Sequence, residues 1–349
     1  MIPPLKLDHL KRMTDSFGLF QFASGISPNS NYGYTLDDNA RALILCSWLI
    51  KKTNTHEVES LIAIYFNFLK KCLQKNGSFI NYIGSDMLPT DQNNKENLED
   101  VQSRALWALC EVVSNKDLPI HMRDEAKKIF LIALPNSLKF TYLRSKAFAI
   151  KSFAIASRAL PERREELLRY IKIYADSLLQ ALKQHSDTSW TWFEDGLSYS
   201  NALLSEALLI AAECTHTVEY KKNGLLSLSF LIQNTFSENI YRPIGNAPWY
   251  IKGQKRSYYD QQPEDPTSMI FALIHAYKFS QDKKYIDLVM QCFNWFLGNN
   301  SLGIPLYDSN SGGCHDGLLP DRVNKDQGAE SLISYLLARV YIERELFSK

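Results

Sequence analysis

The chain has 349 residues, of which 45% are apolar and 22% are charged, a composition that permits a large buried core. Its 39 Lys and Arg residues nearly balance its 38 Asp and Glu residues, so the sequence lacks the excess positive charge typical of proteins that bind nucleic acid or an anionic membrane. No apolar run approaches the ~18 residues that span a bilayer, and the first residues lack the apolar region of a secretory signal. We therefore expect a cytoplasmic protein without nucleic-acid or membrane partners.

From the N-terminus onward, the chain alternates two kinds of predicted helix. One kind is small, Ala-rich and apolar on all sides, as expected of an inner helix; the other is amphipathic with one polar face, as expected of an outer helix. Pairing them predicts hairpins at 36–74, 98–134, 142–184, 196–236 and 264–298, with outer helices near 56–74, 120–134, 162–184, 218–236 and 283–298. A sixth inner helix at 326–344 pairs with the N-terminal segment 4–16 and closes a ring.

This repeat predicts an all-α fold, an (α/α)6 toroid of six helical hairpins. Strand signals are confined to short pieces at 77–83 and 239–245, which we expect to be β-hairpins on the rim. No Pro- or Gly-rich linker interrupts the chain, so the prediction is one domain over residues 1–349.

Two segments show the repeat most clearly. DDNARALILCSWL begins with Asp37 and DVQSRALWALCEV begins with Asp100, and each continues through Arg-Ala-Leu into an apolar helix. Asp37 therefore corresponds to Asp100, and Arg41 corresponds to Arg104. Looser copies begin at Glu194, Pro263 and Lys325.

The loops that precede the inner helices carry the candidate chemistry. They combine carboxylates, amides, Tyr and Trp with few lysines, which suits a neutral polyhydroxylated ligand bound in a central cleft. Four loops contain an acidic doublet: Asp37–Asp38, Glu99–Asp100, Glu194–Asp195 and Glu264–Asp265. One carboxylate suffices to cap a helix, so the second is free for catalysis; capping alone remains the alternative explanation for each doublet.

The segment WTWFED places Trp190 and Trp192 directly before the doublet Glu194–Asp195. This spacing predicts stacking groups beside acid–base groups. The alternative is that both indoles pack beneath the rim.

Motifs for metals and cofactors are missing. The seven histidines form no H-x-x-x-H or H-E-x-x-H pattern, and no glycine-rich phosphate loop occurs. Asp308 begins a D-x-N-x-G run that is faintly typical of a calcium loop but lacks the terminal ligands. None of the six cysteines forms a C-x-x-C pair, so we expect reduced core thiols. The sequence therefore predicts no metal and no cofactor.

The motifs together resemble the six-hairpin glycosidase superfamily. More narrowly, the chain resembles a bacterial family of helical proteins found alone or fused behind glycosyltransferases. The sequence motifs that carry this resemblance are distributed over almost the entire chain: LDHLKRMTDSFGLFQFA, YGYTLDDNARALI, EDVQSRALWAL, WFEDGLSYSNALLSEALL, YYDQQPED, GIPLYDSNSGGCHDGL and NKDQGAES. The consecutive aspartates also resemble those of bacterial α-1,6-mannanases. The resemblance implies an oligosaccharide or glycoside substrate and a functional link to a glycosyltransferase.

The most concrete function is glycoside hydrolysis by one protonated and one ionised carboxyl group. By analogy with six-hairpin enzymes, we expect inversion. The catalytic candidates are, in order, Asp38, Asp100, Asp195 and Glu194, followed by Asp37, Glu99, Asp260, Glu264 and Glu330. Two arginines, Arg41 and Arg104, are expected to orient carboxylates. The side chains expected to contact sugar are Tyr34, Trp190, Trp192, Asn201, Trp249, Tyr259, Gln262 and His315.

Two other functions compete with hydrolysis. A sugar epimerase would share the toroid but normally needs histidines on the inner rim, and here only His315 lies in a suitable loop. A non-catalytic carbohydrate-binding or glycosyltransferase-accessory protein would need the aromatic cleft but no acid pair. A helical scaffold for protein partners is disfavoured because the sequence offers no apolar groove.

Overall fold

The computed structural model describes residues 2–53 and 55–347. These residues form two compact units, each with its own core. The first unit is Leu10–Ile173, and the second unit consists of Met1–His9 together with Tyr174–Lys349. The chain passes from one unit to the other within two helices, α1 (Asp8–Arg12) and α7 (Arg164–His185).

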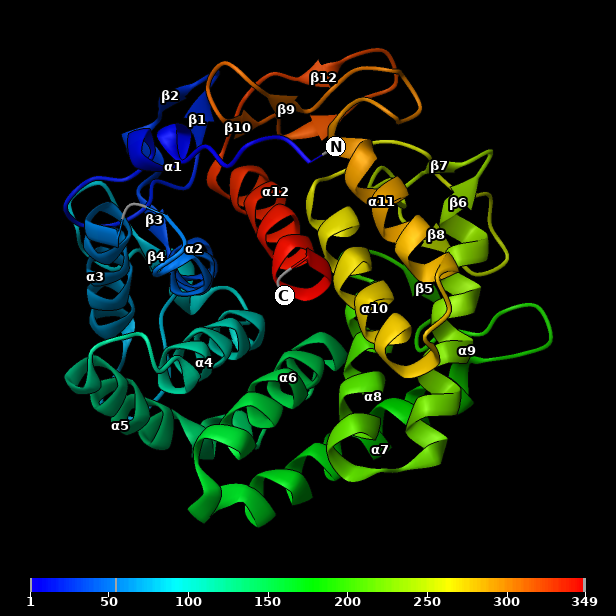
Figure 1. The fold of residues 1–349 in the computed structure, drawn as a ribbon, viewed down its shortest axis with the longest axis horizontal. Helices are drawn as coiled ribbons and strands as arrows, with labels where there is room; N and C mark the ends of the chain where they lie inside the picture. Colours follow the sequence, from blue (N-terminus) through cyan, green and yellow to red (C-terminus); the bar gives the residue numbers. More distant parts are fainter. Residues whose placement is uncertain (1, 54, 348–349) are drawn as a thin grey trace. The chain divides into compact units, whose positions relative to one another are not determined.

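The first unit is built on three helices that pack in sequence order. These are α2 (Leu36–Leu49), α4 (Glu99–Ser114) and α6 (Leu143–Ala159), with α4 in contact with both of its neighbours (Figure 1). Helix α3 (Thr55–Cys72) packs on α2, and α5 (Ile120–Ser137) packs on α4. The predicted hairpins 36–74 and 98–134 are therefore confirmed.

The second unit repeats this arrangement. Its three packed helices are α8 (Ala202–Thr215), α10 (Glu264–Ser280) and α12 (Ala329–Ile342), with α10 between the other two. Helix α9 (Val218–Thr235) packs on α8, and α11 (Lys284–Phe296) packs on α10. The predicted hairpins 196–236 and 264–298 are confirmed, although α8 begins six residues later than the first of these ranges.

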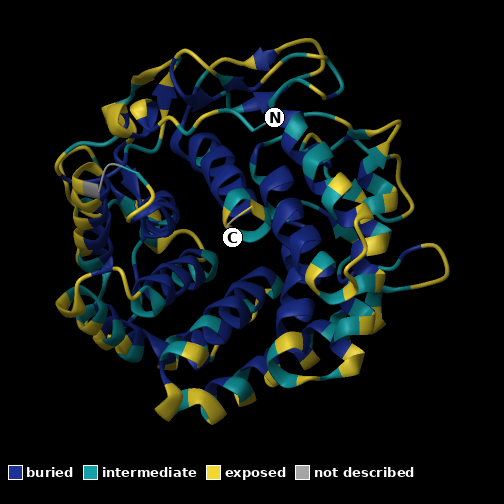
Figure 2. Cartoon of the chain, in the orientation of Figure 1, coloured by how far each residue is buried: buried dark blue, intermediate teal, exposed yellow. Residues whose placement is uncertain are grey.

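Burial separates the two kinds of helix as the sequence predicts. Every residue of α2 except Asp37 is buried, and every residue of α12 except Glu330 is buried. Figure 2 shows these helices in dark blue, whereas α3, α5 and α9 carry exposed stripes. Small and apolar side chains let neighbouring helices approach on all sides, and a polar stripe fixes the outward face of the amphipathic helices.

The N-terminal segment differs from the prediction of a helix at 4–16. Only Asp8–Arg12 is helical, because the chain then turns back: Thr14 forms a β-bridge with Leu19, and the Phe20 N–H donates to the Met13 carbonyl. The segment still contacts the last helix, since Arg339 Nε donates to the Pro3 carbonyl over 2.9 Å.

The strands are two residues long and pair antiparallel. The predicted hairpin at 239–245 is present as β6–β7. The predicted strand at 77–83 contains β4, which pairs with β3 far back in the sequence; the segment also forms local antiparallel bridges, Phe79 with Leu73 and Ile83 with Pro89. The pairs are β1 (Ala23–Ser24) with β2 (Ser27–Pro28), β3 (Tyr34–Thr35) with β4 (Tyr82–Ile83), β5 (Gly196–Leu197) with β8 (Tyr250–Ile251), β6 (Phe236–Ser237) with β7 (Ile240–Tyr241), β9 (Tyr307–Asp308) with β10 (Gly313–Cys314) and β11 (Gly317–Leu318) with β12 (Val323–Asn324). Short helical turns complete the elements: η1 (Ser30–Tyr32), η2 (Asp91–Asn94), η3 (Pro161–Arg163) and η4 (Glu343–Phe347).

All six cysteines are free thiols, and only Cys214 is not fully buried. Within residues 2–53 and 55–347, no helix combines the length and apolar character needed to cross a membrane.

Candidate functional site

The first acidic doublet stands in the first turn of α2, which Thr35 caps. Thr35 Oγ1 accepts from the Asp38 N–H over 3.2 Å and donates to Asp38 Oδ2 over 2.5 Å. The Thr35 hydroxyl thus satisfies one N–H group of the helix N-terminus, and Asp38 holds that hydroxyl in place. Asp38 is only 4% exposed, and its second oxygen accepts from Arg41 Nη2 over 2.9 Å. Both of its oxygens are therefore engaged within the protein.

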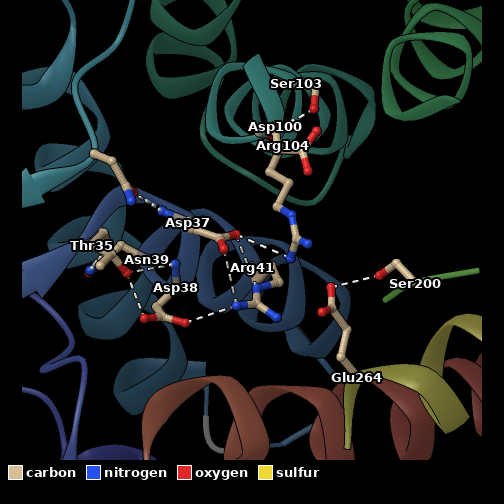
Figure 3. A network of polar contacts seen from close by, with 11 residues as sticks. Thr35, Asp37, Asp38, Asn39, Arg41, Asp100, Ser103, Arg104, Ser200 and Glu264 are labelled. Atoms are coloured by element: carbon tan, nitrogen blue, oxygen red, sulfur yellow. Dashed lines mark hydrogen bonds and ion pairs between the residues drawn. The ribbon is translucent and has the colours of Figure 1, made fainter. Parts of the chain in front are cut away.

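Asp37 is the accessible member of this doublet, and two arginines converge on it (Figure 3). Its Oδ1 lies 3.3 Å from Arg41 Nε and 3.2 Å from Arg104 Nη1. The Asp37 side chain is 24% exposed, whereas each arginine side chain is 5% exposed. Arg41 and Arg104 both form ion pairs with Asp37, and their role in orienting a catalytic carboxylate stays a prediction.

Electrostatics favour a proton on the buried carboxyl group of this doublet. Burial raises the pKa of Asp38 from 3.8 to about 6, and the neighbouring Asp37 adds to this effect. Arg41, the Thr35 hydrogen bond and Arg104 act in the opposite direction. A raised pKa is typical of a general acid, but both oxygens of Asp38 already accept hydrogen bonds, from Thr35 and from Arg41.

The second doublet joins two helices. Glu99 accepts from Thr141 N (2.7 Å), Thr141 Oγ1 (2.8 Å) and Tyr142 N (3.0 Å), and it thereby caps the start of α6. Asp100 Oδ1 accepts from Ser145 Oγ of α6 over 2.5 Å. Both acids therefore fasten α4 to α6, and the alternative explanation by capping fits Glu99.

The third doublet does not begin a helix. Strand β5 follows Glu194 and Asp195 directly, and α8 starts only at Ala202. The Asp195 side chain is 68% exposed and pairs with His185 Nδ1 over 2.9 Å. A catalytic role for Asp195 stays a prediction.

Trp190 and Trp192 belong to the core, which corrects the prediction that they stack on sugar. They are 3% and 0% exposed. Trp190 Nε1 donates to the Glu194 carbonyl over 2.8 Å, and both rings pack against Phe230 of α9. Burying rings of this size in an apolar environment stabilises the folded protein, so the two indoles hold the WTWFED loop onto α9.

Two more predicted sugar contacts are structural. Tyr34 is 3% exposed, and its hydroxyl donates to Asp15 Oδ2 over 2.7 Å. Asn201 is also 3% exposed, and its side-chain amide closes a turn with the backbone of Ser198. The other four side chains are partly exposed and stay predictions: Trp249, Tyr259, Gln262 and His315.

The fourth doublet stands at the start of α10. Asp265 is 7% exposed, and Glu264 Oε1 accepts from Ser200 Oγ over 2.8 Å. Figure 3 shows this bond between Ser200 and Glu264, which links the loop before α8 to α10. Glu330, in the first turn of α12, is the one residue of that helix that is not fully buried.

A different pair of acids comes together in the second unit. Gln261 and Leu318 exchange two backbone hydrogen bonds, of 3.0 and 2.8 Å, which hold the segment after Tyr259 against β11. The approach is so close that a Cβ at Gly317 would lie 2.7 Å from Asp260 Oδ1. Asp316 precedes this glycine. The bridge thus places Asp260 against Gly317, next to Asp316, which lies 56 positions further along the sequence, and the Asp316 charge acts on Asp260.

The environment of this pair raises the pKa of both carboxyl groups. Burial raises the pKa of Asp260, and the charge of Asp316 raises it further. Burial also raises the pKa of Asp316. Two hydrogen bonds act in the opposite direction and lower this pKa: one from the Gly328 N–H to Asp316 Oδ1, over 2.7 Å, and one from Ser331. Asp260 Oδ1 is buried without a hydrogen-bond partner. A proton on Asp260, or a donor group on a ligand, would satisfy this atom.

Sequence reasoning ranked Asp260 low and did not select Asp316. The pairing depends on a backbone bridge between distant segments, which local patterns do not reveal. One feature of the sequence could have identified both acids: each lies in a motif that carries the family resemblance, YYDQQPED for Asp260 and GIPLYDSNSGGCHDGL for Asp316.

His315 lies beside this pair. Its Nδ1 is 3.1 Å from the Lys325 carbonyl, and because a carbonyl only accepts, Nδ1 carries the hydrogen. In the neutral ring, Nε2 is therefore the basic nitrogen.

The Asp308 loop uses its carboxylate to hold itself together. Asp308 accepts from Asn310 N, Ser311 Oγ and Gln327 Nε2 over 2.9, 2.7 and 3.1 Å. In the part of the chain that the structure describes, no three His, Cys, Asp or Glu side chains are grouped as metal ligands.

Comparison with known proteins relates the chain to sugar-processing enzymes by structure alone. No protein-family model matches the sequence, and no curated protein matches it. A D-mannose isomerase shares 11% identity with a TM-score of 0.73, over 96% of this chain and 93% of the other. The cellobiose 2-epimerase of Bacillus thermoamylovorans shares 12% identity with a TM-score of 0.73, over 97% and 96%.

Hydrolases have the same fold. A family 76 glycoside hydrolase (mannosidase) of Bacteroides thetaiotaomicron shares 14% identity with a TM-score of 0.66, over 97% of this chain and 96% of the other. Identities this low relate the folds and leave the reaction open. The chain has an all-α, (α/α)6 toroid fold, which it shares with these isomerases, epimerases and hydrolases.

Proposed function

We propose that the protein is a carbohydrate-active enzyme and, more narrowly, a glycoside hydrolase. The observation that carries this proposal is the placement of Asp260 against Gly317, beside Asp316, with Asp260 Oδ1 buried and without a hydrogen-bond partner; burial raises the pKa of both carboxyl groups. Glycoside hydrolysis requires one carboxyl group that keeps its proton near neutral pH and a second that accepts one. The fold agrees with this choice, since proteins named as mannosidases and mannanases share it.

The two acids differ in a way that suggests their roles. Asp260 has the unpartnered buried oxygen and is the better proton donor, whereas Asp316 is fixed by the Gly328 N–H at the start of α12. A helix N-terminus stabilises a carboxylate. In the proposed reaction, Asp260 protonates the glycosidic oxygen as the bond to the anomeric carbon breaks. Asp316 accepts a proton from the water that attacks this carbon, and the configuration inverts.

The acids favoured by sequence analysis receive different proposed roles. Asp37 remains the candidate carboxylate of the first unit because it is partly exposed and held by two arginines. Asp38, Glu99 and Asp100 are proposed to position helices, since their oxygens are engaged in caps and interhelical bonds. The link to a glycosyltransferase and a cytoplasmic location stay predictions.

A hydrolysis screen tests the proposal. Manno- and gluco-oligosaccharides are incubated with wild type, Asp260→Asn, Asp316→Asn and Asp37→Asn, with melting temperature recorded for each. Asp321→Asn is the control, because that side chain belongs to the same unit as the pair and is 71% exposed. We expect sugar release by wild type and the control, and its loss in folded Asp260→Asn and Asp316→Asn proteins. Full activity in both pair variants would contradict the assignment. Sugar-dependent stabilisation of all variants without turnover would favour a carbohydrate-binding or accessory protein.

A second candidate function is sugar epimerisation or isomerisation. His315 favours it, because its Nδ1 donates to a backbone carbonyl and leaves Nε2 as a base beside Asp316. Such an enzyme would exchange the hydrogen at C2 of a reducing sugar. Incubating mannose and cellobiose in D₂O and following the C2 proton by NMR separates the two functions. Exchange by wild type that is lost in His315→Gln, without new reducing ends, would replace hydrolysis by epimerisation.

A further inference from the structure

We propose that exposed apolar side chains on the loops before α2 and after β4 form a binding surface for a neutral oligosaccharide. The surface, here called the apolar loop cluster, consists of Phe22, Ile26, Tyr32, Met87 and Leu88. The proposal rests on the proposed function for its ligand class, and it adds a second site, in the first unit, remote in sequence from Asp260 and Asp316.

Backbone pairing brings the cluster together. Phe20 bridges Tyr34, which places the chain through Phe22 alongside the chain through Tyr32; these two rings meet edge to face with centroids 5.0 Å apart. Strand β3 then pairs with β4, and the approach is tight enough that a Cβ at Gly33 would lie 2.1 Å from the Ile83 carbonyl oxygen.

The loop after β4 supplies Met87 and Leu88 to the apolar loop cluster. The Gly84 N–H donates to the Leu88 carbonyl and the Met87 N–H donates to the Gly84 carbonyl, which closes a turn directly after β4. Because Gly33 lies against Gly84, Tyr32 and this turn leave the paired strands at the same end. The segments that carry Phe22, Tyr32 and the turn Met87–Leu88 are therefore neighbours at this end of the β3–β4 pair, with Phe22 in contact with Tyr32.

The exposure of these side chains is unusual for the chain. Phe22, Ile26, Tyr32, Met87 and Leu88 are 41, 44, 60, 50 and 60% exposed, and among the described residues before Ile120 they are the exposed large hydrophobic side chains. Apolar residues scattered singly over a surface need no explanation, but exposed apolar residues gathered on neighbouring loops are typical of a binding surface. The Phe22 and Tyr32 rings, which contact each other, offer faces and edges to the C–H groups of a pyranose.

The charges around the cluster select a neutral, hydroxyl-rich ligand. Residues 20–36 contain no charged side chain and supply Gln, Asn and Ser groups that both donate and accept hydrogen bonds. Residues 76–94 contain no Lys or Arg, and their two charges are the acids Asp86 and Asp91. A surface without cations is unsuited to nucleic acid or anionic lipid, which are recognised through phosphates.

The cluster is also tied to the start of α2. Asn81, which directly precedes β4, accepts from the Asp37 N–H over 3.1 Å with its side chain, and its carbonyl accepts from the Leu36 N–H over 2.8 Å. The loops thus have a fixed position relative to Asp37 within this unit.

Binding measurements test the surface separately from catalysis. Mannohexaose and cellohexaose are titrated calorimetrically into Asp316→Asn, chosen so that neither is cleaved, and into the same protein with Tyr32→Ala or Phe22→Ala added. Tyr142→Ala is the matched control, because that tyrosine belongs to the same unit and is 57% exposed. We expect Kd to rise roughly three- to tenfold for either cluster variant, as the loss of one aromatic contact implies, and to stay unchanged for the control.

The outcomes separate this proposal from the proposed function. An unchanged Kd in both cluster variants, or no binding of either hexasaccharide, overturns the surface whether or not wild type hydrolyses sugar. A raised Kd in a protein whose wild type releases no sugar supports the surface and contradicts the hydrolase. A raised KM for hexasaccharides, with kcat unchanged in Tyr32→Ala on the wild-type background, supports both.

Discussion

Arg104 places its Nη1 3.2 Å from Oδ1 of Asp37, the acid of the preceding sequence repeat. The repeat pairs each arginine with the acid four residues before it, and Arg41 does lie 3.3 Å from Asp37. Two arginines that correspond in the repeat therefore meet at one carboxylate, and this contact joins α4 to α2. The guanidinium of Arg104 also lies 4.9 Å from the centre of the Phe148 ring, which extends the connection to α6.

Breaking this contact should destabilise the first unit. Removing either partner leaves a buried charged group short of an opposite charge, so we expect Arg104→Met and Asp37→Asn each to cost about 1–3 kcal/mol. A double-mutant cycle by urea unfolding should give a coupling energy of about 0.5–3 kcal/mol. Strict additivity of the two substitutions would show that the contact carries no energy.

The raised pKa of Asp38 predicts a pH-dependent contribution to stability. The folded state holds the proton up to about pH 6, whereas the unfolded chain releases it near 3.8. This contribution is fully present below the unfolded pKa and is lost as pH rises through the folded pKa. The free energy of unfolding of wild type, relative to Asp38→Asn, should therefore fall between pH 4 and pH 7. A difference that rises with pH for Asp38 would contradict the assignment.

Glu99 should matter for stability and not for turnover. Glu99→Ala removes the acceptor for two N–H groups and one hydroxyl at the start of α6, with an expected cost of about 1–2 kcal/mol. Denaturant unfolding measures it. Glu125→Ala breaks an exposed pair with Lys70 and should cost less than about 1 kcal/mol. Loss of kcat in a stably folded Glu99→Ala protein would instead make Glu99 catalytic.

Trp192 should affect folding and leave sugar affinity intact. Trp192→Ala creates a large cavity between the WTWFED loop and α9 and should cost about 3–5 kcal/mol. Trp192→Phe keeps most of the packing and should cost less. Thermal unfolding and the KM of the folded protein together check this prediction, and a raised KM in a stable Trp192→Phe protein would restore the stacking role.

The helices were predictable because their signal is local. Periodic apolar residues placed the helix near 283–298, observed as Lys284–Phe296, within two residues at each end. The segment 4–16 was predicted too long because the bridge between Thr14 and Leu19 ends the helix, and this bridge depends on chain that lies beyond the helical pattern. Strand β4 was found, but not its partner β3, since the pairing joins residues almost fifty positions apart.

The candidate site was harder to predict than the fold. An acidic doublet at the start of a helix has the same sequence pattern whether an acid is buried against the capping residue, as Asp38 is against Thr35, or stays accessible, as Asp37 does. Burial decides between these states, and burial of a single side chain depends on tertiary packing. Trp192 shows the same limit, because an indole in a loop predicts stacking equally well against sugar and against Phe230.

The most direct test of the central claim is the leaving-group dependence of Asp260→Asn. If Asp260 protonates the departing oxygen, the variant should lose roughly 100-fold or more in kcat on a natural oligosaccharide, whose leaving group needs a proton. It should keep most of its activity on a glycosyl fluoride, whose leaving group needs little protonation. Equal losses on both substrates, or no loss on either, would contradict the assignment of Asp260 as the general acid.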